Sequence, residues 1–201
     1  MVALSVREVG AAYYAGNCHK WLCAPKGAGF LAVRADRHAT VRPAVISHGA
    51  NATRTDRSRL LLEFDWTGTV DPTAYLTVPH AMRFMASLVP GGWPELRERN
   101  HALAVAGRRV VCDALGVLPP CPEAMIGALA AIPIADGSPE PPTSALYADP
   151  LQTLLLERYA IEVPIIPWPK PPKRVVRLSA QLYNAPEEYA RLGAALAQSL
   201  A

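Results

Sequence analysis

The sequence lacks the features that mark several common classes of protein. No apolar run is long enough to cross a bilayer, and the N-terminal segment carries Arg7 and Glu8, which makes it a poor signal peptide. The net charge is only +3, and no basic run is interleaved with aromatic residues. We therefore expect a cytoplasmic protein that binds neither a membrane nor nucleic acid.

Cysteine is also scarce. The four cysteines, Cys18, Cys23, Cys112 and Cys121, form no C-x-x-C pair and do not have the spacing of a zinc site. In the absence of a secretion signal, free thiols in a reducing cytoplasm are the expected state. Cys18 and Cys23 flank Lys20, but we expect buried structural thiols there and no metal.

Proline, in contrast, is abundant, with 20 residues among 201. The prolines cluster in Pro139–Pro142 and Pro164–Pro172, and such runs are incompatible with a helix interior or a central strand. We expect ordered or semi-rigid loops at both places. Hydrophobic residues make up 51% of the chain, which is enough to form a real core.

Start and stop signals predict two helices in the middle of the chain. Asp71-Pro72 places an N-cap before a proline, and Pro79 is expected to kink the helix that follows. The predicted apolar face of this helix consists of Tyr75, Met82, Met85 and Val89. A second helix is predicted from Pro94 to Gly116. Its apolar residues recur every seven positions, at Leu96, Leu103 and Val110.

Beyond Gly116 the pattern changes to strand, helix, strand, strand and helix. Strands are predicted over Ile126–Ile134, Ile161–Ile166 and Val175–Tyr183, and Asp149-Pro150 starts the helix between the first two. In the last strand the residues expected to face the core are Val176, Leu178, Ala180 and Leu182. Asn184 and Glu187 resemble a capping box for the final helix.

The residues best suited to chemistry lie in the segment Asn17-Cys18-His19-Lys20-Trp21. Short strands are predicted on both sides of it, over Ala11–Tyr14 and, as a buried strand, over Phe30–Val33. A lysine amine that is held and partly desolvated can condense with an aldehyde cofactor. His19 and Asn17 could donate hydrogen bonds to a phosphate. Taken by itself, however, a lysine in a loop is usually a solvated surface charge.

The wider string YYAGNCHKWLCAPKGAGFL resembles the cofactor-lysine segment of class V aminotransferases, which depend on pyridoxal 5'-phosphate (PLP). It is most similar to the branch that includes isopenicillin N epimerase-like proteins. The resemblance implies that Lys20 forms the Schiff base with PLP and that His19 and Asn17 lie near the cofactor phosphate. Many members of the family have a serine where this chain has Asn17.

Two further segments match the family in the same order. The segment FDWTGTVD, residues 64–71, resembles a Gly-Thr element, which implies that Thr69 reaches the cofactor phosphate of the neighbouring subunit in a homodimer. The segment RLSAQLYN, residues 177–184, resembles the C-terminal Arg-x-Ser strand, which implies that Arg177 binds the α-carboxylate of an amino-acid substrate. A guanidinium fork matches a carboxylate in a bidentate way. The alternatives are a threonine that only precedes a helix cap and a surface arginine on an edge strand.

The resemblance also implies that Lys20 serves as the general base at the substrate Cα. Return of the proton to Cα would give epimerisation, and return to the cofactor would give transamination; the sequence leaves both open. A cysteine desulfurase or lyase is a further alternative. The desulfurases of the family use a nucleophilic cysteine, and no cysteine lies between Tyr147 and Arg177. We therefore disfavour desulfuration.

The resemblance implies an α/β fold, namely a partial large domain of a PLP-dependent transferase of fold type I followed by a small domain. We expect residues 1–93 to form the C-terminal part of the PLP-binding domain, residues 94–116 a connecting helix, and residues 117–201 a small α/β domain. A sheet that is cut short exposes an edge and apolar surface. We therefore expect the isolated chain to self-associate.

One element of the family pattern lies outside this chain. In the family an Asp-x-Ala-His-like strand end precedes the lysine, and its aspartate pairs with the pyridine nitrogen of the cofactor. This chain begins after that point. We therefore expect an N-terminally truncated enzyme, whose missing half could be a separate chain. The alternative is a non-catalytic remnant or a dimerising half.

Overall fold

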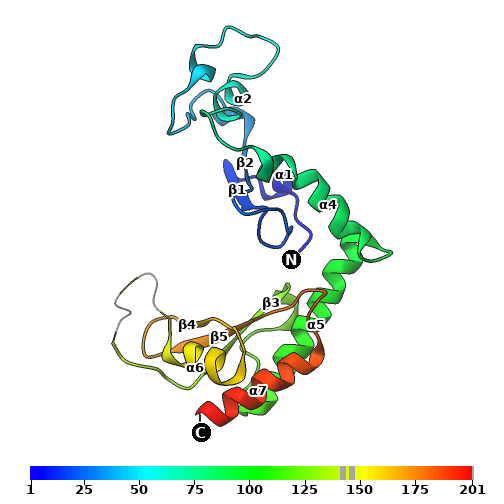
Figure 1. The fold of residues 1–201 in the computed structure, drawn as a ribbon, viewed down its shortest axis with the longest axis vertical. Helices are drawn as coiled ribbons and strands as arrows, with labels where there is room; N and C mark the ends of the chain where they lie inside the picture. Colours follow the sequence, from blue (N-terminus) through cyan, green and yellow to red (C-terminus); the bar gives the residue numbers. More distant parts are fainter. Residues whose placement is uncertain (141–143, 145–147, 201) are drawn as a thin grey trace. The chain divides into compact units, whose positions relative to one another are not determined.

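The computed structural model describes residues 1–140, 144 and 148–200. These residues divide into two compact units, one of Ala3–Gly92 and the other of Met1–Val2 with Trp93–Ala201 (Figure 1). Each unit has its own hydrophobic core. Pro141 and Pro142, in the first predicted proline-rich loop, lie outside the described residues. Within the described part of the chain no helix is both long and apolar enough to cross a membrane.

The N-terminal unit is built on a two-stranded hairpin and several short helices. β1 (Tyr13–Asn17) pairs antiparallel with β2 (Gly29–Val33), with Asn17 opposite Gly29. The other elements are α1 (Val6–Val9), η1 (Ala35–Arg37), η2 (His48–Asn51), α2 (Arg59–Phe64), α3 (Thr73–Leu76) and α4 (Val78–Ser87). The hairpin brings the two ends of the segment 18–28 together.

The strand predicted over Phe30–Val33 exists, but the prediction that it is buried is wrong. Phe30 is 46% exposed and Leu31 is 47% exposed. The sheet has only two strands, and the small core of this unit lies between the hairpin loop and α4 rather than on the strands. The Phe30 ring lies across Gly16, where any added Cβ would overlap it, and stacks on Tyr14.

The helix predicted after Asp71-Pro72 is divided at Thr77 into α3 and α4, close to the predicted kink at Pro79. Proline has no N–H to donate and is favoured in the first turn, so a new helix begins there. The predicted apolar face is half right: Met85 and Val89 are buried, whereas Tyr75 and Met82 are exposed. The buried positions Ala81, Met85 and Val89 recur every four residues, and Met82 lies one position away from that spacing.

The C-terminal unit packs helices against a three-stranded sheet of order β3-β5-β4, in which β5 is antiparallel to both neighbours. Its elements are α5 (Gly92–Leu115), η3 (Glu123–Met125), β3 (Leu129–Ile134), α6 (Pro150–Tyr159), β4 (Ile165–Pro167), β5 (Arg174–Ser179) and α7 (Pro186–Leu200). The predicted order of strand, helix, strand, strand and helix is confirmed, although each strand is shorter than predicted.

The long helix α5 has a buried stripe that differs from the predicted one. The stripe consists of Leu96, Asn100, Ala104, Gly107 and Val111. Of the predicted heptad positions, Leu96 is buried, but Leu103 is only partly buried and Val110 is 39% exposed. Seven residues fall short of two full turns of a straight helix, so residues at this spacing drift off one face.

Small residues on α5 and α7 let the two helices come close. An added Cβ on Gly107 would lie 2.7 Å from Cγ of Tyr189, and one on Gly193 would lie 2.9 Å from Cβ of Ala114. The contacts occur in the same order along both helices, which therefore run in the same direction (Figure 1). Tyr189 also donates its hydroxyl to the carbonyl of Ser179 at 2.8 Å. This tyrosine thus joins α5, α7 and the end of β5.

Replacing Gly107 with alanine is expected to destabilise the chain by about 1–3 kcal/mol, because the new methyl group overlaps the Tyr189 ring in a packed core. Urea denaturation followed by circular dichroism measures the loss. In a Tyr189→Leu background the overlap is gone, so the additional cost of Gly107→Ala should disappear. An equal cost in both backgrounds would contradict the packing described here.

A buried ion pair links the start of β5 to α6. Arg174 Nη1 lies 2.7 Å from Asp149 Oδ1, and the two side chains are 12% and 4% exposed. Asp149 Oδ1 also accepts from the nitrogen of Leu151 at 2.9 Å, which caps α6 as predicted. Arg174 Nε donates to the carbonyl of Ala135 at 2.9 Å. The pair therefore fixes β5 relative to both α6 and the end of β3.

The substitution Asp149→Ala is expected to cost about 3–5 kcal/mol, because it leaves a buried guanidinium unpaired and removes a helix cap. A matched control is Asp136→Ala, which breaks the exposed pair with Lys173, where the side chains are 45% and 65% exposed. That control should cost at most about 1 kcal/mol. Thermal and urea denaturation measure both, and similar losses would show that burial of the Asp149 pair is unimportant.

Candidate functional site

The segment that carries Lys20 is closed by hydrogen bonds to one carbonyl. The oxygen of Ala28 accepts from the backbone nitrogens of Cys18 and His19, at 3.0 and 3.3 Å. The nitrogen of Ala24 donates to the carbonyl of Cys18 at 3.0 Å and folds the segment a second time. The core beneath it consists of Cys18, Ala24, Ala28 and Ala81 of α4. Residues 18–28 therefore form a fixed loop at the end of the hairpin, which we call the Lys20 loop.

The same carbonyl orients the ring of His19. Nδ1 of His19 lies 2.8 Å from the oxygen of Ala28. A carbonyl can only accept, so Nδ1 carries a proton and Nε2 is the free atom of the ring. A phosphate oxygen would therefore meet Nε2, and Nε2 can donate to it only when the ring carries both protons.

Lys20 combines a fixed backbone with a free side chain. Its carbonyl accepts from the nitrogen of Cys23 at 3.1 Å, and Cys23 has a φ of +59°, in the left-handed region. The side chain of Lys20 is exposed and has no hydrogen bond or ion pair with any other described residue. The backbone of Lys20 is therefore fixed, and its amine is accessible to a bound molecule.

The other predicted cofactor residues lie in the same unit. Asn17, the last residue of β1, is exposed and lines a shallow depression beside the Lys20 loop. Thr69 is exposed in the segment between α2 and α3. Among the hydrogen bonds of the described residues none joins Thr69 to the Lys20 loop. Asn17, His19 and Lys20 thus lie together at the end of the hairpin. Among the described residues Thr69 makes no hydrogen bond to them.

These residues fit a phosphorylated aldehyde such as PLP. A free amine on a fixed turn suits the aldehyde. The amide of Asn17 is a donor that suits a phosphate, and Nε2 of His19 is a second donor when the ring carries both protons. Both donors are at least partly exposed, so a bound molecule can reach them. The individual roles of Asn17, His19, Lys20 and Thr69 stay predictions.

Arg177 lies in the other unit, on β5. Val176 and Leu178 are buried and Arg177 is exposed, as the alternation predicts. The alternative that Arg177 lies on an edge strand is wrong, because β5 runs between β3 and β4. The described residues form no ion pair with Arg177. A carboxylate could therefore bind it without displacing another group, and its role in substrate binding stays a prediction.

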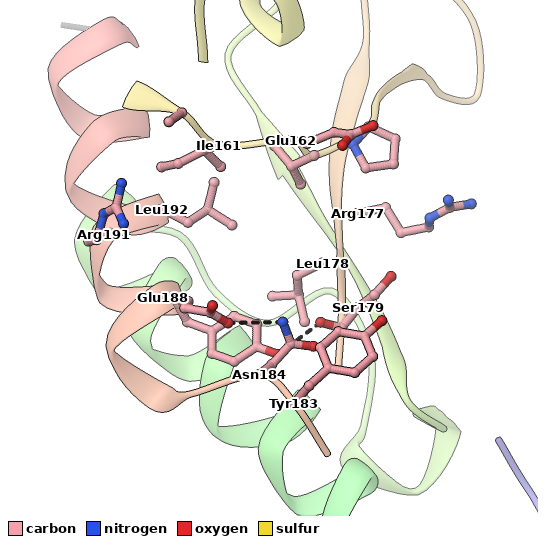
Figure 2. Close-up of a pocket in the computed structure, with 14 residues that line it drawn as sticks. Ile161, Glu162, Arg177, Leu178, Ser179, Tyr183, Asn184, Glu188, Arg191 and Leu192 are labelled. Carbon is pink, nitrogen blue, oxygen red and sulfur yellow. Dashed lines mark hydrogen bonds between the residues drawn. The ribbon is translucent and has the colours of Figure 1, made fainter. Parts of the chain in front are cut away.

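A cavity of about 300 Å³ adjoins this face of β5, and Figure 2 shows the side chains that line it. Arg177 and Arg191 lie on opposite sides of the view, and Arg191 is held by the carbonyl of Tyr159 at 2.9 Å. Tyr183 and Asn184, from the loop after β5, form the lower wall. Glu162 and Glu188 also line the cavity, so it carries cationic, anionic and neutral polar groups.

The cap of α7 differs from the predicted one. Glu188, not Glu187, accepts from Asn184 Nδ2 at 2.9 Å and from the nitrogen of Ala185 at 3.1 Å. The physical reason is the start of the helix: α7 begins at Pro186, so Glu188 occupies its third position. The cap holds the loop that forms the lower wall of the cavity.

A buried amide pair at the start of the same loop was not predicted. Asn100 Nδ2 donates to Gln181 Oε1 at 2.8 Å, and the two residues are 1% and 5% exposed. Gln181 Oε1 also accepts from the nitrogen of Leu182 at 2.9 Å. The sequence does indicate that Asn100 is buried, because Asn100 lies midway between Leu96 and Ala104 on the buried stripe of α5. A polar side chain on such a stripe requires a buried partner.

The two cysteines that flank Lys20 differ in burial. Cys18 is buried as predicted, but Cys23 is exposed, so the prediction of a buried thiol there is wrong. Cys23 lies at the outer corner of the turn that begins at Lys20, away from the small core. Within the described residues, no cluster of three or more His, Cys, Asp or Glu side chains could hold a metal ion.

Comparison with known proteins decides the family. No family model matches the chain. The chain is 31% identical over 203 residues to a protein named probable L-cysteine desulfhydrase, chloroplastic, from Arabidopsis thaliana, over 95% of this chain and 40% of that protein. It is 33% identical over 195 residues to isopenicillin N epimerase of Amycolatopsis lactamdurans, over 92% of this chain and 46% of that protein. The chain belongs to the class V aminotransferase branch.

The structural comparison agrees with this assignment for the fold. A cysteine desulfurase from Escherichia coli superposes with a TM-score of 0.60 and 18% identity, over 97% of this chain and 47% of that one. The mixed α/β architecture is therefore that of a fold type I enzyme, as the sequence predicts. The chain spans less than half the length of the curated class V relatives it matches.

Tyr189 provides a spectroscopic test of the cavity wall. Burial, and to a smaller extent Glu188 and Tyr183, raise the pKa of Tyr189 to about 12. The stability that this raised pKa contributes is fully present below about pH 10, the pKa of an unfolded tyrosine, and is lost as the pH rises through about 12. Tyrosinate absorbance against pH should therefore show one tyrosine that ionises late.

The substitution Tyr189→Phe is expected to remove that late step and to reduce the loss of stability above about pH 10. Tyr183→Phe, at a residue that is 80% exposed, is the control and should leave the late step in place. If the titration curve of Tyr189→Phe still contained the late step, the buried position of Tyr189 would be contradicted.

Proposed function

We propose that this chain is the lysine-bearing part of a PLP-dependent enzyme that acts on an amino acid. The observation that carries the proposal is the Lys20 loop, in which a fixed backbone presents a free amine beside an oriented histidine. The relatives named as cysteine desulfhydrases and isopenicillin N epimerases support it, since both names refer to amino acids or compounds derived from them.

The chemistry divides between the cofactor and the chain. When bound, PLP supplies an aldehyde that condenses with amines and a ring that withdraws electrons from the substrate Cα. The Lys20 amine would hold the group at that aldehyde. His19 and Asn17 would hold its phosphate, and the guanidinium of Arg177 would hold the substrate carboxylate.

Proton transfer at the substrate is assigned to Lys20 as well. The amine of Lys20, when neutral, would accept the proton from the substrate Cα. Return of that proton to the opposite face of Cα would invert the substrate, and its delivery elsewhere would give transamination. The same lysine serves both outcomes, so we propose the amino-acid class of substrate and not one of these two reactions.

We further propose a homodimer in which Thr69 contributes to the cofactor site of the second copy. Thr69 is exposed and has no hydrogen bond to the Lys20 loop of its own chain, among the residues described. An exposed hydroxyl can donate a hydrogen bond to a phosphate oxygen. The cytoplasm remains the predicted location, and a separate chain that carries further residues of the cofactor site is a possible second partner.

Release of sulfide from cysteine is the second candidate function. Several relatives, including those from Arabidopsis thaliana, are named L-cysteine desulfhydrases. An elimination from cysteine begins with removal of the Cα proton by a base, which Lys20 can provide without a protein thiol. The absence of cysteine between Tyr147 and Arg177 therefore argues only against reactions that need a thiol nucleophile. Incubation with L-cysteine and detection of sulfide distinguishes this candidate.

The proposal predicts that PLP labels one lysine selectively. Titration of the purified chain with PLP should give a saturable Schiff-base absorption, and reduction with borohydride should trap the cofactor on Lys20. Lys20→Ala should remove at least about nine-tenths of the trapped label, because a phosphate held by Asn17 and His19 would keep the aldehyde beside Lys20 and raise its effective concentration there. Peptide mass mapping measures the label at each position.

Lys26 provides the matched control, since it is an exposed lysine in the same loop. Lys26→Ala should leave the labelling of Lys20 unchanged. Equal labelling of Lys20 and Lys26, or no saturable binding, would contradict a cofactor site in this chain. It would favour the alternative of a non-catalytic remnant or a dimerising half.

A further inference from the structure

The N-terminal unit leaves large apolar side chains exposed around a small core. The core cluster beneath the hairpin consists of Cys18, Ala24, Ala28 and Ala81, none of them larger than a cysteine. The large side chains on and beside the hairpin have exposed fractions of 46–49%, namely Tyr13, Phe30, Leu31 and Trp66. A cluster of exposed apolar side chains marks a site of contact with another protein. The hairpin therefore has apolar surface that another polypeptide can cover.

Both faces of the hairpin carry these side chains. Leu31 and Val33 point to one face, where they line a cavity of about 520 Å³ together with Trp66. Successive residues of a strand alternate between faces, so Phe30 points to the other face, where its ring stacks on Tyr14 with 6.0 Å between the centroids. A sheet at the surface keeps one polar face, whereas a sheet that is apolar on both faces is covered on both.

The outer edge of β2 is open as well. At the end of the hairpin the nitrogen of Cys18 donates to the carbonyl of Ala28 at 3.0 Å. Bonded and non-bonded pairs alternate along antiparallel strands, so the backbone groups of Gly29 and Leu31 point away from β1. No hydrogen bond joins them to a described residue outside the hairpin. Natural edge strands are protected by charged residues or proline, and β2, with the sequence GFLAV, has neither.

A second copy of this chain does not meet these requirements. Two copies joined edge to edge through β2 would extend the sheet, but each would bring faces that are equally bare. Two copies joined face to face would cover one face only, because a two-fold interface uses the same patch on both copies. The hairpin therefore requires a partner with a different surface.

The length of the relatives indicates where such a partner comes from. The chain matches 46% of the epimerase of Amycolatopsis lactamdurans and 40% of the probable desulfhydrase of Arabidopsis thaliana. More than half of each of these proteins therefore has no counterpart in this chain. That part is long enough to supply both a neighbouring strand and the elements that cover two faces.

We propose that the hairpin is the docking surface for a second polypeptide, of the kind that forms the unmatched part of these relatives. The polypeptide adds a strand along the outer edge of β2 and places apolar side chains against both faces. Main-chain hydrogen bonds to Gly29 and Leu31 set the register, and the cavity beside Leu31 takes a side chain. The inference rests on the proposed second chain but not on PLP, so this docking and the labelling of Lys20 can fail separately.

The test is co-expression of the full chain with the unmatched N-terminal part of the Amycolatopsis lactamdurans epimerase, and separately with that of the Arabidopsis thaliana desulfhydrase. Each of these two probes carries an affinity tag. At least one of them should retain the chain in about equimolar amount through purification. Retention of the chain by neither probe would overturn the proposal.

Variants test the two faces one at a time. Leu31→Glu and Phe30→Glu each place a carboxylate on one face, where a covering surface would remove it from water. Each should reduce the amount of retained chain at least about ten-fold. Leu118→Glu, at a residue of the C-terminal unit that is 87% exposed, is the matched control and should change nothing. A loss in only one hairpin variant, or an equal loss in the control, would overturn docking on both faces.

Hydrogen exchange on the unchanged chain decides the matter if a hairpin variant loses its fold. The amide of Leu31 should exchange readily in the chain alone and at least about ten-fold more slowly in the complex, because strand addition gives it an acceptor. An amide that exchanges equally fast in the complex would overturn the proposal. Protection of this amide in the chain alone would show that a second copy occupies the edge, and would overturn it too.

Discussion

The carbonyl of Ala28 is the acceptor on which the site depends. It receives two backbone nitrogens and the ring of His19, and the alanine itself is fully buried against small residues of the loop and α4. These bonds define where Lys20 lies, although the lysine side chain makes none of them. The arrangement also explains why a loop with two residues in left-handed conformations, Cys23 and Gly27, can hold one shape. The backbone position of Lys20 is thus set by these bonds, and its side chain remains free of hydrogen bonds and ion pairs with the described residues.

The C-terminal unit is organised differently, around close packing of helices. Gly107 and Gly193 let α5 and α7 approach, and Tyr189 fills the space between them and closes the end of β5. Asn100 and Gln181 add a polar contact inside this packing and fix the loop that follows β5. Arg177 projects from the strand that all of these contacts hold. Each unit therefore presents one exposed cationic side chain, Lys20 in the N-terminal unit and Arg177 in the C-terminal unit.

Sequence reasoning succeeded where local chemistry decides the outcome. The element order of the C-terminal unit, the Asp149 cap of α6 and the exposure of Arg177 all follow from capping residues and strand alternation. It failed where burial depends on what packs from elsewhere. Phe30 and Leu31 have the composition of a buried strand, but their two-stranded sheet leaves them exposed. The buried position of Asn100 was not predicted, because a seven-residue repeat does not follow one face of the straight helix α5. The capping role of Glu188 was not predicted, because α7 begins one residue later than expected.

The central claim is that Lys20 binds PLP covalently within this loop. A crystal structure of the chain grown with PLP tests it most directly. We expect continuous density from Lys20 Nζ to the aldehyde carbon of the cofactor, with a phosphate oxygen within hydrogen-bond distance of His19 Nε2 while His19 Nδ1 still donates to the carbonyl of Ala28. Density that links the cofactor to Lys26 or to another lysine, with the Lys20 amine free, would contradict it.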